Sequence, residues 1–283
     1  MARRLTTTAG AATRLFLIAG AMAMLLGSVA RAGTHYDLYL LAGQSNMDGR
    51  GKAADLKPEK REIPGAIIFY RNPPAASDGW KPLTPGYSVA PGYKGPLPSP
   101  TFGPEIGFAI EMRKDRPDHP IALIKGSKGG TSLAHDWKPG EAGEPESQGP
   151  CYRNFIETIH LAGKDLEARG DTYTLRGILW HQGESDDKAT ADQYQQMLTT
   201  FIARVRGDLG QPELPFVIGE VYDNGKRGPV RAAQRATAKA VPHVAFIPAD
   251  GTKTWDNGTH FDADSQLTIG ARFADSMAKL IGT

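Results

Sequence analysis

The sequence is poor in cysteine and carries little net charge. Cys151 is its single cysteine, so an internal disulfide is excluded and the fold must rest on core packing. The formal net charge is +2, and four of the 33 basic residues are arginines within the first 32 residues, which leaves 29 basic against 31 acidic residues downstream. A chain so close to neutrality gives no sign of nucleic acid or an anionic membrane as a partner.

Several catalytic motifs are missing as well. There is no His-Glu-x-x-His pattern, and the histidines and acids at 135–136, 181–184 and 260 lack the spacing of a metallohydrolase, so we expect no metal site. The glycine-bearing stretch 125–132 has no Gly-Lys-Ser/Thr ending, which disfavours phosphate binding. The immediate neighbours of Cys151 include no base, and we interpret this residue as a structural thiol.

The first 32 residues predict a signal peptide. Arginines at 3, 4 and 14 precede an apolar stretch from Leu15 to Leu26, and Ala30-Arg31-Ala32 supplies a small-residue cleavage site. The apolar stretch is too short to span a bilayer comfortably. We therefore expect cleavage after Ala32, one domain over residues 33–283, and a periplasmic or secreted protein with no membrane contact after cleavage. The sequence does not fix the oligomeric state.

Downstream of residue 33, short apolar runs alternate with amphipathic helix patterns. The runs cover 38–42, 66–70, 121–124, 175–180, 216–221 and 244–248; the helix patterns begin at 105 and cover 154–169, 191–209, 229–240 and 265–281. This alternation predicts an α/β fold with a parallel sheet and helices on both faces. The long Pro- and Gly-rich stretch 72–104 contains four aromatic residues, which either pack beneath the loop or stack sugar rings at its rim.

Polar residues follow several of these predicted strands. Ser45 comes just after the first strand, and Gln182 follows the strand ending at Trp180. Because parallel strands deliver such residues to one edge of the sheet, they can share a cleft. A serine hydroxyl needs a base to become a nucleophile, and His260 is the candidate. Backbone N–H groups at Gly129 and Gly130, with the Gln182 amide, would stabilise an oxyanion, which is the arrangement of a serine hydrolase.

Taken together, four motifs resemble the sialate O-acetylesterase (SASA) family, which includes the carbohydrate esterase family 6 acetylxylan esterases and belongs to the SGNH hydrolase superfamily. They are Gly43-Gln44-Ser45-Asn46-Met47, Gly129-Gly130-Thr131-Ser132, His181-Gln182-Gly183-Glu184 and Gly258-Thr259-His260-Phe261. The resemblance covers essentially the whole of residues 33–283. It implies a flavodoxin-like three-layer α/β/α sandwich with a central parallel sheet (the SGNH hydrolase fold) and cofactor-free hydrolysis of O-acetyl esters on carbohydrates, such as acetylxylan or a sialic-acid-like substrate.

The resemblance also implies residue roles. By position, Ser45 is the nucleophile and His260 the base, and the Ser45 and Gly130 N–H groups form the oxyanion hole with the Gln182 amide. The acid that orients the histidine is open. The superfamily usually has Asp three residues before the histidine, where this chain has Asn257, with Asp256 one residue earlier. We expect Glu184 to take this role, with Asp256 second, although Gly258 could absorb the extra residue; a Ser–His dyad is the third option.

Residues beside these motifs are expected to contact the substrate. Gln44, Asn46 and Gly129 adjoin the proposed nucleophile and oxyanion donors. Trp137 fits the core as well as it fits a sugar platform, and we include it as a substrate residue. Two other functions remain open: a general SGNH lipase or arylesterase, disfavoured by the absence of a long apolar lid, and a non-catalytic carbohydrate-binding protein, disfavoured by the co-occurrence of nucleophile, amide donor and base.

Overall fold

A parallel sheet forms the centre of the unit Gly33–Thr283. The structure is a computed structural model that describes residues 1, 33–114, 116–256 and 258–282, so the predicted signal peptide lies outside the described residues apart from Met1. The parallel strands are β1 (His35–Gly43), β3 (Ala66–Asn72), β7 (Ile121–Ser127), β8 (Thr172–His181), β9 (Phe216–Gly219) and β10 (Val244–Ile247). They lie in the order β10-β9-β8-β1-β7-β3.

The strand order places a crevice beside β1. Without β3, the parallel strands β1, β7, β8, β9 and β10 can be numbered 1 to 5 in chain order, and they then lie in the flavodoxin order 2-1-3-4-5. Strand β3 is therefore an addition at the edge of the sheet, next to β7. The chain runs outward from β1 to β7 and then returns past β1 to β8, and β1 pairs with both strands. Open α/β sheets bind ligands at the carboxyl ends of strands where the direction of winding reverses, which here means the ends of β1 and β8.

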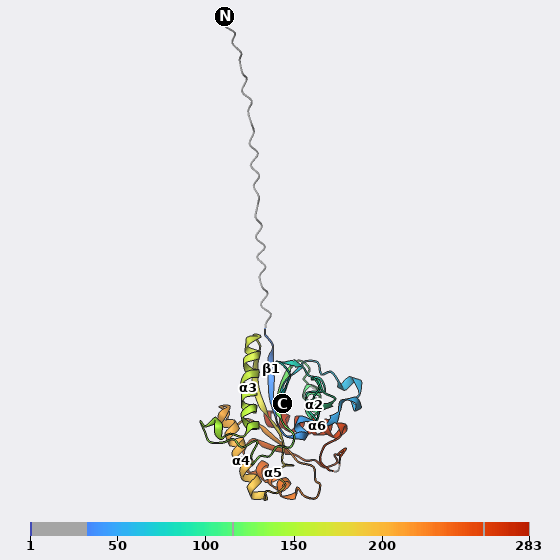
Figure 1. The fold of residues 1–283 in the computed structure, drawn as a ribbon, viewed down its shortest axis with the longest axis vertical. Helices are drawn as coiled ribbons and strands as arrows, with labels where there is room; N and C mark the ends of the chain where they lie inside the picture. Colours follow the sequence, from blue (N-terminus) through green and yellow to red (C-terminus); the bar gives the residue numbers. More distant parts are fainter. Residues whose placement is uncertain (2–32, 115, 257, 283) are drawn as a thin grey trace. The chain divides into compact units, whose positions relative to one another are not determined.

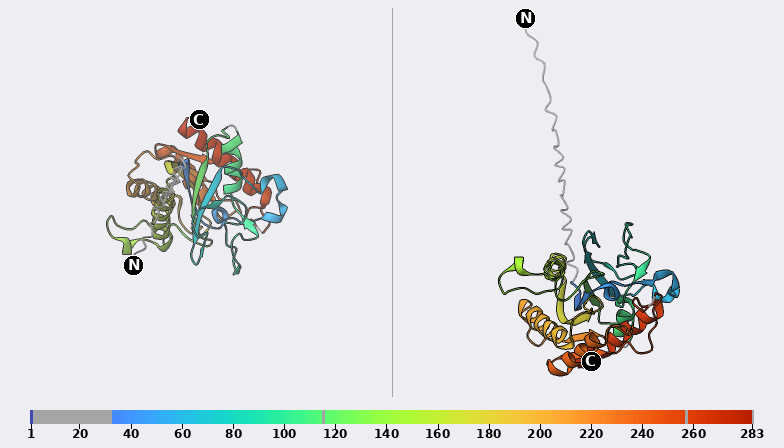
Figure 2. Two further views of the ribbon diagram at one scale, coloured as in Figure 1. Left: turned by 90° about the horizontal axis from the view of Figure 1, so that it is seen from above. Right: turned by 60° about the horizontal axis from the view of Figure 1, so that its bottom comes forward.

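Helices cover both faces of the sheet, as Figure 1 shows. Alternate residues of β1 enter different cores: Leu38 and Leu40 pack in the cluster that includes residues of α3 (Pro150–Ala168), α4 (Ala191–Asp208) and α5 (Gly228–Ala240). Tyr39 and Leu41 pack in the cluster with residues of α2 (Glu105–Lys114) and α6 (Ala263–Ile281). This follows from the two-residue period of a strand. The predicted three-layer α/β/α sandwich is confirmed, and the layers are visible from two further directions in Figure 2.

Helix and strand limits differ from expectation by a few residues. The helix expected from 154 begins at Pro150, because proline suits the first helical position, where no N–H partner is needed. The helix expected from 265 begins at Ala263, after Asp262 caps the Ser265 N–H. Smaller elements complete the fold: α1 (Ser45–Asp48), β2 (Gly51–Lys52), β4 (Ala75–Ala76), β5 (Lys81–Pro82), β6 (Thr101–Phe102), and the 3₁₀ turns Ala53–Asp55, Pro58–Lys60 and Pro145–Ser147.

The Pro-rich segment 72–104 is an ordered part of the core. Trp80 and Tyr87 are each 5% exposed, and Phe102 is fully buried. The Trp80 indole donates to the Ala162 carbonyl 3.0 Å away, which ties the segment to α3. Three of its four aromatic residues therefore pack beneath the loop; Tyr93 alone of the four lines a cavity.

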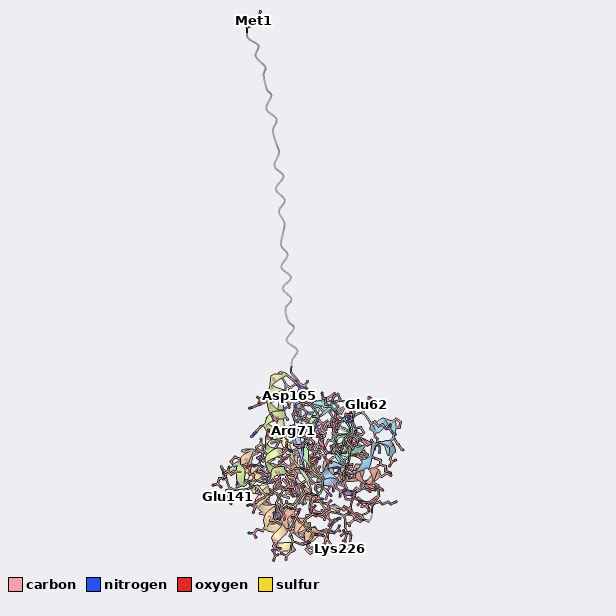
Figure 3. All side chains as sticks on the ribbon, in the orientation of Figure 1. Met1, Glu62, Arg71, Glu141, Asp165 and Lys226 are labelled. Carbon is pink, nitrogen blue, oxygen red and sulfur yellow. The ribbon has the colours of Figure 1, made fainter. Side chains whose placement is uncertain are left out.

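The second polar loop, 138–149, lies at the periphery, where Glu141 is labelled in Figure 3. Arg204 of α4 holds it there by donating to the backbone carbonyls of Gly140 and Glu141, each 3.2 Å away. This loop contributes no residue to the cavity described below.

A buried ion pair links the end of β7 to neighbouring segments of the fold. Lys125 at the end of β7 is fully buried and donates from Nζ to Glu105 Oε2 at 2.8 Å, to the Asp48 carbonyl at 2.7 Å and to the Tyr87 carbonyl at 2.9 Å. Each ammonium proton thus has an acceptor, which is the condition under which a buried lysine can stay charged. The arrangement joins β7, α2 and the turn after Ser45.

Candidate active site

A cavity of about 810 Å³ opens at the carboxyl ends of β1, β7 and β8. The register aligns Gly43 with Ser127 on one side and with His181 on the other, so the residues after these positions converge. Its lining includes most of the residues expected from sequence at the site: Gln44, Ser45, Gly129, Gly130, Glu184 and His260. The sequence thus correctly predicted which segments meet.

Ser45 occupies the first position of α1, immediately after the first strand. Gly43 has φ +146° and no room for a side chain, since a Cβ would lie 2.1 Å from the His181 carbonyl oxygen. The Gln44 N–H donates to that same oxygen at 3.0 Å, which fixes the turn. Among the described residues, neither the hydroxyl nor the N–H of Ser45 has a hydrogen-bond partner. Both are therefore available to a ligand.

The loop after β7 lies against the serine. A Cβ added to Gly129 would be 3.4 Å from Ser45 Cβ and 2.6 Å from Arg50 Nη2. Gly130 follows with φ +74° and open space on its Cβ side. Two consecutive small residues let the backbone come this close, and the Gly130 N–H has no acceptor within the described part of the chain.

His260 is held by Asp256. Its Nδ1 lies 2.5 Å from Asp256 Oδ2, and the N–H groups of His260 and Thr259 donate to Asp256 Oδ1 at 2.6 and 3.2 Å. Burial acts to raise the pKa of Asp256, but these hydrogen bonds and the nearby imidazole outweigh it and lower the pKa below the usual value. Because an ionised carboxylate only accepts, Nδ1 carries a proton, and in the neutral imidazole Nε2 is then the acceptor.

The expectation that Glu184 orients the histidine is wrong. Glu184 Oε1 instead accepts from Asn46 Nδ2 at 2.6 Å. The reason is the shape of the loop between β10 and α6 that carries His260, which we call the histidine loop. In this loop Gly258 adopts φ +84°, which compensates for the position of Asp256 one residue earlier than the usual acid. A local carboxylate then reaches Nδ1 without help from β8.

Asn46 couples Glu184 to this loop. Its Nδ2 donates to the Thr259 carbonyl at 2.9 Å, and its Oδ1 accepts from the Phe261 N–H at 3.1 Å. The Asn46 amide is therefore hydrogen-bonded to the backbone of the residues on both sides of His260. Glu184 can satisfy only a donor, which fixes the orientation of the Asn46 amide. Asn46 and Glu184 thus position His260 relative to Ser45; the expected substrate contact of Asn46 is replaced by this internal role.

Gln182 does not face the cavity, contrary to expectation. It is fully buried, and its Nε2 lies 2.5 Å from Asp186 Oδ2, 3.1 Å from the Thr131 carbonyl and 3.3 Å from Gln44 Oε1. With both amide protons used internally, none remains for an oxyanion. Gln182 instead joins the loop after β7 to the loop after β8.

Gln44 offers the amide donor that Gln182 does not. Its Oε1 accepts from Gln182 Nε2 and from the Ser185 N–H, both at 3.3 Å, which turns its Nε2 the other way. That nitrogen has no acceptor among the described residues, and Gln44 lines the cavity. Sequence reasoning placed Gln44 in the site, but only the chain of hydrogen bonds reveals which of its atoms is free.

Trp137 belongs to the core, so its expected substrate role is wrong. It is 1% exposed, its indole donates to Thr131 Oγ1 at 3.0 Å, and it packs edge-on against Trp180 with ring centroids 5.2 Å apart. Cys151 is also buried, and burial raises the pKa of its thiol to about 11, which agrees with a structural thiol.

Four cationic residues in the cavity wall were missed, one of them Lys94 in the Pro-rich segment. Arg50 pairs with Asp48 at 2.7 Å, Lys128 precedes the two glycines, and Arg227 donates to the Gly258 carbonyl at 3.0 Å. Arg50 is close enough to the serine motif to have been considered. Arg227 gave no sequence signal, because its place depends on how the loop after β9 folds back onto the histidine loop.

The described residues contain no group of three or more His, Cys, Asp or Glu side chains arranged to hold a metal ion. No helix in the described part of the chain is long and apolar enough to cross a membrane.

Comparison with known proteins shows the family of the chain. A family model described as carbohydrate esterase, sialic acid-specific acetylesterase (SASA), matches residues 35–279. The chain belongs to this family. Membership in a carbohydrate esterase family supports the activity of a carboxylic ester hydrolase.

Individual relatives are distant but similar in fold. The probable carbohydrate esterase At4g34215 of Arabidopsis thaliana is 24% identical over 255 residues, covering 84% of this chain and 89% of the relative. The crystal structure of that Arabidopsis protein matches with a TM-score of 0.68 at 22% identity, over 87% of this chain and 98% of the other. A carbohydrate acetylesterase from Xanthomonas citri matches with a TM-score of 0.63 at 19% identity, over 87% of this chain and 57% of the other.

Proposed function

We propose that this protein is an exported serine esterase that removes O-acetyl groups from carbohydrate through an acyl-enzyme. The observation that carries the proposal is that Ser45 and His260 line one cavity at the end of the central strand, and that His260 is hydrogen-bonded to Asp256 behind it. Family membership limits the chemistry to ester hydrolysis. Within that limit, an unpartnered serine hydroxyl that shares a cavity with an oriented imidazole supplies the two groups that nucleophilic catalysis needs.

The mechanism follows from the protonation of His260. With the Nδ1 proton directed to Asp256, Nε2 takes the proton of Ser45 as its oxygen attacks the acetyl carbonyl. The resulting oxyanion is stabilised by the N–H groups of Ser45 and Gly130, and by Gln44 Nε2 in place of Gln182. The imidazolium gives its proton to the leaving sugar oxygen, and an acetyl ester remains on Ser45. Water, deprotonated by the same imidazole, then releases acetate and restores the serine.

Polar side chains form part of the cavity wall, beside an apolar side that includes Pro73, Val89 and Pro91. Side chains from four separate segments present polar groups to the cavity: Arg50, Asn72, Lys128 and Ser185. Such groups lose hydration when an alkyl chain enters and gain nothing in return, whereas sugar hydroxyls replace the lost hydrogen bonds. This supports a carbohydrate ester over the long-chain esters of a lipase.

Acetate release from a panel of substrates tests the proposal. Purified protein spanning residues 33–283 is given acetylated xylan, O-acetylated sialic acid, and p-nitrophenyl esters of increasing chain length. We expect release from at least one glycan and falling activity as the acyl chain lengthens. Preference for long chains would favour the lipase instead, and binding without turnover would favour a non-catalytic carbohydrate-binding protein.

The nucleophile is tested separately. Ser45→Ala should lower kcat by about 10⁶, because a serine hydrolase without its nucleophile keeps only the contribution of binding and oxyanion donors. Ser185 presents the other serine hydroxyl in the cavity and is the natural comparison. If Ser185→Ala abolishes turnover while Ser45→Ala retains a tenth of it, the assignment of Ser45 is wrong.

Export is tested by processing. When the full chain is expressed in a bacterium with a secretion system, N-terminal sequencing of the recovered protein should read from Gly33, since Ala30-Arg31-Ala32 has the small residues that signal peptidase requires. Recovery of an uncleaved chain from the cytoplasm would contradict this part of the proposal and leave the esterase chemistry untouched.

A further inference from the structure

Trp255 is an exposed tryptophan beside the site. Its side chain is 55% exposed, whereas the other three tryptophans, Trp80, Trp137 and Trp180, are 5%, 1% and 0% exposed. Large aromatic side chains contribute to folding mainly by burial, so leaving an indole in water forgoes stability. An exposed indole next to a site therefore calls for an explanation in binding.

The indole is held in a fixed orientation. The backbone N–H of Trp255 donates to the His260 carbonyl at 3.1 Å, and Thr254 and Phe261 form an antiparallel bridge around the same turn, so the backbone that carries the indole is held in place. One face of the indole stacks on the imidazole of His260, with ring centroids 5.9 Å apart and planes inclined by 18°. A side chain fixed in this way loses little conformational entropy when a ligand packs on its free face.

The indole is in direct contact with a residue of the active-site cavity. His260 lines that cavity, and Trp255, which does not line it, stacks on the His260 ring. The indole Nε1 has no hydrogen-bond acceptor among the described residues. The indole thus presents to solvent, one ring away from the cavity, a flat apolar face with one free donor at its edge.

This combination suits a sugar ring. A pyranose has an apolar face of C–H groups, which gains by leaving water, and a girdle of hydroxyls that accept hydrogen bonds. A protein partner fits less well, because a single indole is far smaller than the apolar patches that mark protein interfaces.

We propose that Trp255 stacks a second sugar ring, adjacent to the ring whose acetyl group lies at Ser45, so that the substrate is an oligosaccharide or polysaccharide. The inference rests on the proposed function, since it takes its first ring from the acetylated sugar in the cavity. It adds a subsite outside the cavity and selects chains over single sugars.

Binding without turnover tests the subsite. In the Ser45→Ala background, the acetylated glycan that the wild type hydrolyses fastest is titrated calorimetrically as its monosaccharide and as its tetrasaccharide. Adding Trp255→Ala should lower the ratio of tetrasaccharide affinity to monosaccharide affinity about tenfold, because the second sugar ring then loses the apolar face on which it packs. Trp255→Phe should retain most of the ratio. Leu161→Ala removes another exposed apolar side chain, on α3, and serves as the control.

Two results would overturn the inference. An unchanged ratio, whether both affinities fall or neither does, would show that Trp255 contacts no second ring. If Trp255→Ala shifts the pH profile of kcat/KM and leaves the affinity ratio unchanged, the indole acts instead by stabilising the positive charge on His260 through a cation–π contact. Failure of the proposed function is distinct from both, because the wild type would then release acetate from no glycan.

Discussion

At the scale of single residues, the two carboxylates near His260 act at different distances from the chemistry. Asp256 contacts the imidazole directly, while Glu184 reaches it through Asn46. Asp256→Asn should therefore lower kcat by about 10⁴, since an amide neither fixes the tautomer nor stabilises the imidazolium. Glu184→Gln should lower it by about 10² or less, through a small displacement of the histidine loop.

The comparison is made with kcat for p-nitrophenyl acetate, with circular dichroism confirming that both variants are folded. Asn46→Ala provides a matched check on the indirect route, because it removes the link between Glu184 and the loop while leaving both carboxylates in place. A larger loss in Glu184→Gln than in Asp256→Asn would contradict the assignment.

Asp256 also has a consequence for stability in acid. Its pKa is lowered in the folded protein, so the unfolded chain takes up the proton at a higher pH than the folded chain does. Its contribution to stability is therefore present above the ordinary aspartate pKa of about 4 and is lost as the pH falls through the lower, folded value. We expect the difference in unfolding free energy between wild type and Asp256→Asn to be largest near pH 6 and to vanish in acid. Denaturant titrations at several pH values measure it; a difference that stays constant would show no linkage.

The sequence predicts those features of the site that depend on local motifs, and it does not predict those that depend on contacts between distant segments. Ser45, His260 and the paired glycines are marked by strand ends and short motifs, and they line the same cavity. The roles of Gln182 and Trp137 depend on partners such as Asp186 and Trp180, which are brought to them by the packing of other elements. A polar residue after a strand looks the same in sequence whether its amide faces the cavity or a buried carboxylate.

At the scale of elements, the crossing of α2 and α6 positions the histidine loop. A Cβ on Gly270 would lie 2.3 Å from the Pro104 carbonyl oxygen and 2.6 Å from the Phe108 nitrogen, so the two backbones are nearly in contact. Because α6 begins three residues after His260, a shift of this helix moves His260. Only the packed helices reveal this contact, since a glycine within a helical pattern otherwise predicts weak helix formation.

Gly270→Ala should destabilise the protein by about 1–3 kcal/mol, because two backbones must separate. It should also lower kcat. The matched control is Gly207→Ala in α4, where an added Cβ meets nothing within 4 Å; the same change there should be neutral or stabilising by up to about 1 kcal/mol. Equal effects of the two substitutions in thermal unfolding would refute close packing as the cause.

At the scale of the whole molecule, alternation of strands and helices was enough to predict the architecture but not the strand order. Parallel strands must be joined by crossovers, but this requirement is met by many strand orders, and the flavodoxin order is one of them. The added strand β3 pairs with β7 on one side and with β4 and β5 on the other. Nothing in the short run 66–70 indicates which edge of the sheet it joins, because a strand buried on both faces has no distinguishing pattern.

The rate at which a reagent labels the single buried thiol measures how often the structure around this thiol opens. Cys151 lies at the start of α3 and lines a small cavity of about 200 Å³ together with Asn72, Pro73 and Lys128, three residues that also line the active-site cavity. With a pKa of about 11, its thiolate population at pH 8 is about 10² lower than that of a free cysteine, so a thiol reagent should label the native protein at least that much more slowly than the unfolded chain.

Because the sequence contains no other thiol, every labelling event reports the same place. A glycan bound in the active-site cavity should slow the reaction further, by holding the shared wall closed, and this protection would yield a binding constant without any engineered probe. Labelling of the native protein as fast as that of the unfolded chain would show that the wall opens freely.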